Sequence, residues 1–215
     1  MKLITDKASN GLQSNEFSEF LLTRVPKTEF TAIEADELEQ TLKDGLKNYP
    51  GLGISATQLG IKKRACYIKF GDEEDSRELF LVNPVITDRS KEGFLFYEGC
   101  LSIPKTIEKP LRTIRSCKIK VQTDNLGELE FEINPEGDKV DERVSMETMM
   151  TVIVQHEIDH LDGITIKDRI YSTTITKKNN YGRNDKIVMK SPAGELVEVK
   201  YKKANNYFLQ GYEIV

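Results

Sequence analysis

The sequence predicts an α+β protein, with strands in its first half and a long apolar helix after them. Three observations support this fold class. Ala35 to Asn48 has the spacing of an amphipathic helix that ends before Pro50. Runs rich in β-branched and aromatic residues at 64–70 and 79–87 are typical of strands. Residues 142–161 then form a largely apolar helix, and most of its faces must be buried.

Two more strands are expected at 117–123 and 129–133. They lie on either side of Asp124-Asn125-Leu126-Gly127, which is a hairpin signal. The apolar helix is expected to end at Gly163, because glycine is common directly after a helix. These elements predict antiparallel sheets around a central helix.

The composition changes after Tyr171, and the chain is expected to divide there. Residues 1–171 are predicted to form the main domain, 172–185 a polar linker, and 186–215 a small module of unknown role. This C-terminal module has a ββαβ pattern, with strands at 187–190, 196–201 and 212–215, a turn at 191–194 and a short helix at 203–210.

Charge and composition favour a cytoplasmic protein with no membrane contact. The 215 residues carry a net charge of −4, 31% of them are charged, and no apolar run is long enough to cross a membrane. The chain starts without an apolar signal segment and has three cysteines, an odd number, so reduced thiols are expected rather than disulfides. Residues 171–215 hold eight Lys and Arg against four Asp and Glu, a net charge of +4, which leaves −8 for the rest.

The two histidines of the chain, His156 and His160, both lie in the run QHEIDHLDG near the end of the apolar helix. A spacing of four places both imidazoles on one face of a helix, where they can bind one metal ion with Glu157 beside it. Two buried imidazoles without a metal or hydrogen bonds would each cost on the order of 1–3 kcal/mol. The pattern HExxH therefore predicts a metal site.

A catalytic site of this kind usually has three protein ligands. The position six residues after the second histidine is Ile166, which excludes the metzincin pattern, while a gluzincin-type peptidase would use Glu195 or Glu198 downstream. The remaining candidate is a cysteine. Cys66 and Cys117 are expected to be buried strand thiols, whereas Cys100 follows a glycine in EGCLSIP, an irregular segment suited to a metal ligand.

Three motifs, in this order along the chain, resemble those of the peptide deformylase family. GLGISATQ at 51–58 resembles the family's GxGxAAxQ, EGCLS lies at 98–102, and QHEIDHLDG lies at 155–163. The resemblance covers roughly residues 49–168. It departs at Ser55, where the family usually has alanine, and before Pro50, where the usual opening is not recognisable. It implies a peptide-deformylase-like fold, with residues 1–171 as the catalytic domain.

The resemblance also implies the roles of the site residues. Cys100, His156 and His160 would hold one divalent metal, expected to be Fe(II) natively, while zinc, nickel or cobalt could occupy the site in purified protein. Glu157 would move the proton, and the Gln58 amide and the Leu101 backbone N–H would stabilise the oxyanion. The rival interpretation of the glycine-rich segment, a phosphate-binding loop, lacks the GKS or GKT ending.

The implied reaction is removal of the N-formyl group from the initiator methionine of newly synthesised polypeptides, with release of formate. The substrate residues would be Leu52, Gly53, Ile54, Phe96, Tyr97, Gly99, Met149, Val152 and Ile153. The basic C-terminal segment suggests a transient ribosome contact, without sequence-specific nucleic acid binding. The alternatives are a non-catalytic, metal-stabilised binding domain and a zincin-type peptidase.

Overall fold

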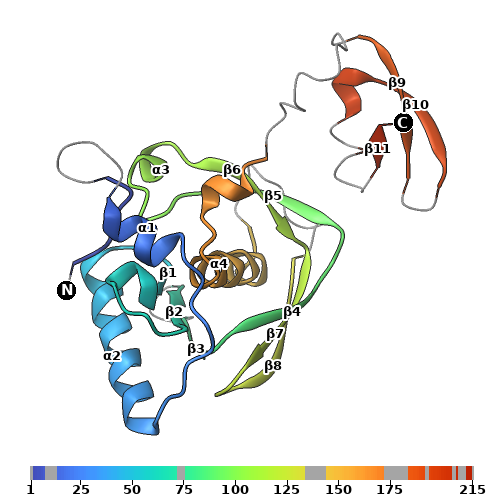
Figure 1. Cartoon of the computed structure of the whole chain (residues 1–215). Helices are drawn as coiled ribbons and strands as arrows, with labels where there is room; N and C mark the ends of the chain where they lie inside the picture. Colours follow the sequence, from blue (N-terminus) through green and yellow to red (C-terminus); the bar gives the residue numbers. More distant parts are fainter. Residues whose placement is uncertain are drawn as a thin grey trace.

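The computed structural model describes residues 2–7, 14–71, 76–133, 144–171, 184–191, 194–204, 207 and 212–214. The main part is an α+β arrangement in which antiparallel sheets surround one helix, α4 (Met146–Leu161), as Figure 1 shows. One sheet has the order β1-β2-β3 and another β4-β7-β8, and β5 pairs with β6. The strands are β1 (Gly53–Ser55), β2 (Ala65–Phe70), β3 (Arg77–Val82), β4 (Val85–Arg89), β5 (Gly93–Glu98), β6 (Leu111–Ser116), β7 (Lys118–Thr123) and β8 (Gly127–Glu132).

Helix α4 packs into the main core. Its buried side chains Val154, Ile158 and Leu161 join apolar residues of β2, β3 and β7 in one cluster. The helix begins at Met146, because the Ser145 side chain caps the first turn by accepting from the Thr148 N–H. The predicted start at 142 was therefore too early: Val144 is not helical, and 142–143 lie outside the described residues. Gly163 follows the helix with φ +72°, as predicted for its C-terminal side.

Helix α2 (Ala32–Asn48) starts three residues before the predicted position. Thr31 and Glu34 form a reciprocal capping box, which satisfies the first backbone N–H groups of the helix. The apolar stripe of α2 packs against β1, β2 and the short helix η1 (Ala56–Leu59). This contact holds the glycine-rich segment on one side of α4.

The strand predicted at 79–87 is two strands, β3 and β4. Asn83 between them has φ +51°, and its side-chain amide donates to the Thr28 carbonyl (2.6 Å) and the Asp124 carboxylate (2.8 Å). These bonds hold a left-handed turn in front of Pro84, which cannot donate to a ladder. The predicted hairpin is present as β7 and β8, but Cys117 precedes β7 and β8 begins at Gly127.

Several elements had no counterpart in the sequence prediction. They include the β5–β6 hairpin, the helices α1 (Asn15–Leu21) and α3 (Lys105–Glu108), and the short helix η2 (Ile166–Arg169). The first and last of these carry residues that contact the metal-ligand helix, as described below.

The C-terminal module contains a three-stranded sheet of order β10-β9-β11, from β9 (Lys186–Lys190), β10 (Leu196–Lys200) and β11 (Glu213–Ile214). Alternate residues Ile187, Met189 and Val199 pack with Ala204 in its small core. β10 ends at Lys200, one residue before the predicted end, because η3 (Tyr201–Lys203) follows directly. The predicted linker up to 183, the turn at 192–193 and most of the helix at 203–210 lie outside the described residues. None of the described helices is long and apolar enough to span a bilayer.

Candidate metal centre

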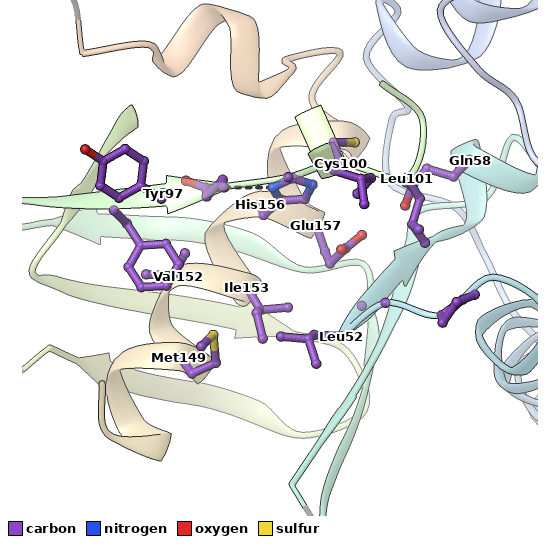
Figure 2. Close-up of a pocket in the computed structure, with 17 residues that line it drawn as sticks. Leu52, Gln58, Tyr97, Cys100, Leu101, Met149, Val152, Ile153, His156 and Glu157 are labelled. Carbon is purple, nitrogen blue, oxygen red and sulfur yellow. Dashed lines mark hydrogen bonds and ion pairs between the residues drawn. The ribbon is translucent and has the colours of Figure 1, made fainter. Parts of the chain in front are cut away.

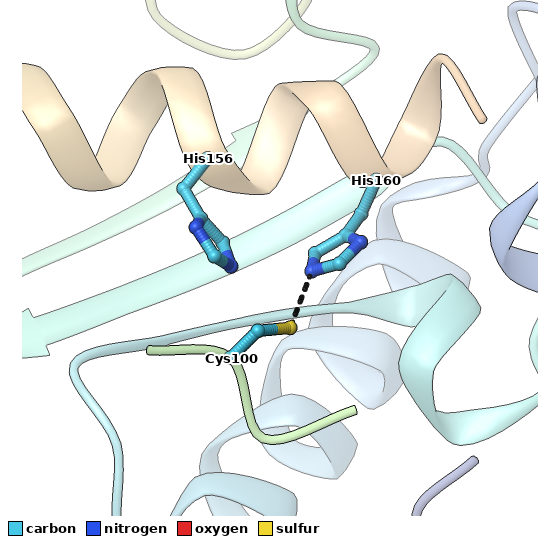
Figure 3. Close-up of side chains that lie close together, drawn as sticks. All are labelled: Cys100, His156 and His160. Atoms are coloured by element: carbon cyan, nitrogen blue, oxygen red, sulfur yellow. Dashed lines mark hydrogen bonds between the residues drawn. The ribbon is translucent and has the colours of Figure 1, made fainter. Parts of the chain in front are cut away.

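Three side chains of metal-ligand type meet at the face of α4. His156 and His160 lie one turn apart on the helix, and Cys100 comes from the segment directly after β5 (Figure 3). Their ligand atoms all lie within 4.8 Å of one another, and Cys100 Sγ is 3.3 Å from His160 Nε2. A tetrahedral ion places a sulfur and a nitrogen ligand about 3.5 Å apart, so the set fits a divalent metal such as zinc or iron. Among the described residues this is the one group of its kind.

The backbone around Cys100 is held by a tight turn. Its N–H donates to Thr106 Oγ1 (2.8 Å), and that hydroxyl donates to the Ile103 carbonyl (2.7 Å). A side chain at Gly99 would meet the Thr106 carbonyl oxygen at 3.0 Å, so glycine allows the turn to close. The two hydrogen bonds of Thr106 and the close approach at Gly99 hold this turn in place, so that the Cys100 thiol points toward the two histidines.

A buried ionic network orients His156 from behind. His156 Nδ1 donates to Glu98 Oε2 at 2.8 Å, which leaves Nε2 for a metal. Arg115 Nε and Nη2 donate to the two oxygens of Glu98 at 2.6 and 2.7 Å, and its Nη1 donates to Asp159. Arg169 also binds Asp159 through two hydrogen bonds of 2.9 and 2.7 Å.

This network keeps both carboxylates charged although they are buried. Burial opposes ionisation of Glu98, but His156 and Arg115 hold its pKa well below the usual range. Burial likewise opposes ionisation of Asp159, and Arg169 and Arg115 lower its pKa. The prediction from sequence missed all of these partners, because Arg115 and Arg169 lie in elements that it did not contain.

Glu157 lies next to the ligands in a buried position. Burial raises its pKa to about 7, against the opposing charges of His156 and His160. Its Oε2 atom has no hydrogen-bond partner within the described part of the chain. A Cβ atom at Gly53 would lie 2.6 Å from Glu157 Oε1, so any other residue there would force this carboxyl to shift. A buried, unpartnered carboxyl with a pKa near neutrality suits proton transfer.

Cys100 is poised to ionise. Burial opposes this, but the charges and hydrogen bonds of His160 and His156 outweigh burial and lower the pKa of the thiol to about 5. By contrast, burial raises the pKa of Cys66 well above its ordinary value and that of Cys117 to about 11. The thiolate, the form that binds metal, is therefore favoured at Cys100 alone among the three.

A cavity of about 350 Å³ opens in front of these residues. Figure 2 shows Met149, Val152 and Ile153 of α4 lining it below His156 and Glu157, with Leu52 beside Ile153 and with Gln58 and Leu101 at the upper right. Its predicted members also include Gly53, Phe96, Tyr97 and Gly99, and Pro50, Gly51 and Ile107 line it without having been predicted.

Ile54 is the exception among the predicted pocket residues, because the prediction that its side chain lines the pocket was wrong. The side chain is fully buried in the cluster between α2 and β2, and it does not line the cavity. Side chains alternate along a strand, and the Gly53 position faces Ile153 and Glu157 of α4. Ile54 therefore points to the other face, toward α2.

The two downstream glutamates considered as ligands, Glu195 and Glu198, lie at β10 in the C-terminal module. Glu198 forms an ion pair of 2.6 Å with Lys186 in that sheet. Neither glutamate belongs to the group of possible ligands. The arrangement thus differs from that of a gluzincin.

Comparison with known proteins agrees with this geometry. The family model described as polypeptide deformylase matches residues 19–175. Peptide deformylase 2 of Clostridium perfringens is 38% identical over 139 residues, covering 63% of this chain and 77% of that protein. A peptide deformylase of Natranaerobius thermophilus is 37% identical over 137 residues, covering 62% and 77%.

Solved structures show the same fold. A probable peptide deformylase from Synechococcus phage S-SSM7 matches with a TM-score of 0.59 at 28% identity, covering 79% of this chain and 99% of that one. A class I type b peptide deformylase from Acinetobacter baumannii matches with a TM-score of 0.54 at 26% identity, covering 78% and 100%. With the family model spanning 19–175 and the three motifs meeting at one cavity, this chain belongs to the polypeptide deformylase family.

Proposed function

We propose that this chain removes the formyl group from the N-terminal methionine of newly synthesised polypeptides and releases formate. The observation that carries the proposal is the position of Glu157. Its buried carboxyl lines an apolar cavity beside three converging ligand atoms. A purely structural metal site has no use for such a carboxyl.

Cys100, His156 and His160 would hold the metal. The chemistry that a divalent ion supplies in such a site is acidification of water and polarisation of a carbonyl oxygen. The thiolate adds negative charge to the ligand set and weakens that acidification, so a base beside the site is required. Glu157, with its pKa raised to about 7, is suited to that role.

The residues of the chain then divide the work of one hydrolysis. Glu157 takes a proton from a water molecule while the oxygen of that water bonds to the formyl carbon. The Gln58 side-chain amide and the Leu101 N–H donate to the developing oxyanion, each contributing roughly 3–4 kcal/mol to lowering the barrier. Glu157 returns the proton to the amine nitrogen as the C–N bond breaks, which leaves formate and a free N-terminus.

The cavity would select methionine by its shape. Met149, Val152 and Ile153 form an apolar wall that a thioether side chain can contact. The backbone of 52–54 and 96–99 would flank the peptide like a short added strand. Such binding would select the first side chain of the substrate and accept different side chains at the following positions.

The native metal is proposed to be Fe(II). The ligand set of one thiolate and two imidazoles suits iron, zinc, cobalt or nickel, and the family resemblance favours iron. Protein loaded with zinc should be less active than protein loaded with iron at equal metal content. Equal activity would contradict the iron assignment.

Residues 1–171 are proposed as the catalytic domain, 172–185 as a linker, and 186–215 as an appended module. The family match ends at 175, near the predicted boundary. The net charge of +4 over 171–215 suits either a solvated appendage or a transient contact with ribosomal RNA. Sedimentation with ribosomes at low and moderate salt tests this contact, and binding equal to that of a chain ending at 171 would rule it out.

The deciding experiment is hydrolysis of a formyl-methionyl tripeptide by protein purified without oxygen, with formate and bound metal measured on one sample. Formate release in proportion to bound metal is expected. The control substrate is the acetyl-methionyl peptide, which should remain intact. Metal without formate release would favour a metal-stabilised binding domain, and cleavage of internal peptide bonds would favour a zincin-type peptidase.

A further inference from the structure

Ser55 forms hydrogen bonds with a residue of the proposed site. It is the last residue of β1 and is fully buried. Its backbone N–H donates to Gln58 Oε1 at 2.9 Å, and its Oγ lies 3.1 Å from the same oxygen. Because an amide oxygen can only accept, the Ser55 hydroxyl is the donor in the second bond.

The neighbouring contacts give this set of bonds one direction. Thr57 Oγ1 lies 3.1 Å from Ser55 Oγ. The one hydroxyl hydrogen of Ser55 is already donated to Gln58 Oε1, so the Thr57 hydroxyl donates to Ser55 Oγ. On the other side, Gln58 Nε2 donates to Ser102 Oγ at 3.2 Å. Thr57 therefore donates to Ser55, Ser55 donates to Gln58, and Gln58 donates to Ser102. This chain of hydrogen bonds joins two of the three sequence motifs.

We propose that Ser55 is a positioning residue for the Gln58 amide, an inference that rests on the proposed function. Two donors on Oε1 and one acceptor on Nε2 fix which end of the amide faces each neighbour. The second hydrogen of Nε2 is left for the substrate, since Gln58 lines the cavity beside Leu101 (Figure 2). Each bond to Oε1 also polarises the amide, which makes Nε2 a stronger donor.

The Ser55 hydroxyl donates to Gln58, whose amide donates to the developing oxyanion, so loss of this hydroxyl should affect turnover more than substrate binding. Ser55→Ala, which installs the usual family residue, keeps the backbone bond and removes the hydroxyl. This variant should lower kcat about three- to tenfold, which is the rate effect expected from the loss of one hydrogen bond, and KM should stay nearly unchanged. In a Gln58→Ala background the same change should have no further effect on kcat.

Ser191→Ala is the matched control. Ser191 is also a buried serine, and its side chain accepts from the Glu195 N–H in the C-terminal module. Loss of this hydroxyl should leave kcat, KM and metal content as in the unaltered chain. The comparison separates loss of a buried hydroxyl in general from loss of the bond to Gln58.

A second readout follows the amide directly. In metal-loaded protein labelled with ¹⁵N-glutamine, the Gln58 side-chain NH₂ signals should exchange with solvent faster in Ser55→Ala than in the unaltered chain and the Ser191→Ala control. If the unaltered chain released no formate, the proposed function would fail, and this exchange rate would still test the action of Ser55. Unchanged exchange with unchanged kcat, or an equal drop of kcat in the Gln58→Ala background, would overturn the proposal.

Discussion

Replacing Arg115 by methionine tests the buried network behind His156 most directly. The Arg115 side chain is 1% exposed, and the Glu98 and Asp159 carboxylates that it joins are 4% and 2% exposed. Methionine is unbranched and flexible, fills most of the volume of arginine and carries no charge. The change therefore removes charge and hydrogen bonds while leaving little empty space.

The expected cost follows from what each carboxylate retains. Asp159 keeps both bonds from Arg169, but Glu98 loses Arg115, the one arginine that binds it among the described residues, and retains His156 and Thr113. Removing one partner of a buried ion pair costs about 3–5 kcal/mol, because the remaining charge stays out of water. That is a large part of the roughly 5–15 kcal/mol that stabilises a typical domain. Looser support of His156 should also weaken metal affinity about 10- to 100-fold.

Urea unfolding of metal-free and metal-loaded protein measures the loss of stability, and competition with a chelator measures the loss of metal affinity. Arg169→Met is the matched control: its side chain is 31% exposed and Asp159 keeps Arg115, so it should cost less than about 2 kcal/mol. Arg115→Lys keeps the positive charge but lacks the planar guanidinium group, so its stability cost should lie between those of Arg115→Met and Arg169→Met. If Arg115→Met cost less than Arg169→Met, the network would not support the site as argued.

The other predictions concern single residues of the site. Glu157→Gln should retain metal and lose about two to four orders of magnitude in kcat, and a near wild-type rate would show that another group moves the proton. Cys100→Ala should lose bound metal, whereas Cys66→Ala and Cys117→Ala should keep it and lose roughly 1–2 kcal/mol of stability; metal analysis and urea unfolding of the three variants decide this. Gly53→Ala should displace the Glu157 carboxyl, because the added Cβ would lie 2.6 Å from its Oε1, so kcat should fall while metal content stays constant; unchanged kcat would contradict this contact.

The local geometry of the site could be predicted from the sequence. A spacing of four along a helix places His156 and His160 on one face regardless of the surrounding fold, and the adjacent Glu157 follows from the same helix. The amphipathic pattern of α2 and the turn residues of the β7–β8 hairpin are local signals of the same type. Each depends on residues that are close along the chain.

Strand boundaries were less predictable, because they depend on distant partners. The break between β3 and β4 lies where Asn83 bonds to Thr28 and Asp124, far away in the sequence. The dipeptide Asn83-Pro84 is a turn signal within this run, but the apolar residues on both sides of it favoured one continuous strand. The hairpin of β5 and β6 was missed, and Glu98 and Arg115 were therefore not recognised as partners.

The sequence by itself determined the histidine pair on one helix face, the acid beside it and the family to which the motifs belong. Only the tertiary structure decided that Cys100 lies 3.3 Å from His160, that Arg115 joins Glu98 to Asp159, and that Gly53 rather than Ile54 faces the site. The physical reason is that helix periodicity is set by neighbouring residues. The register of a strand and the face that it presents are instead set by packing against segments far along the chain.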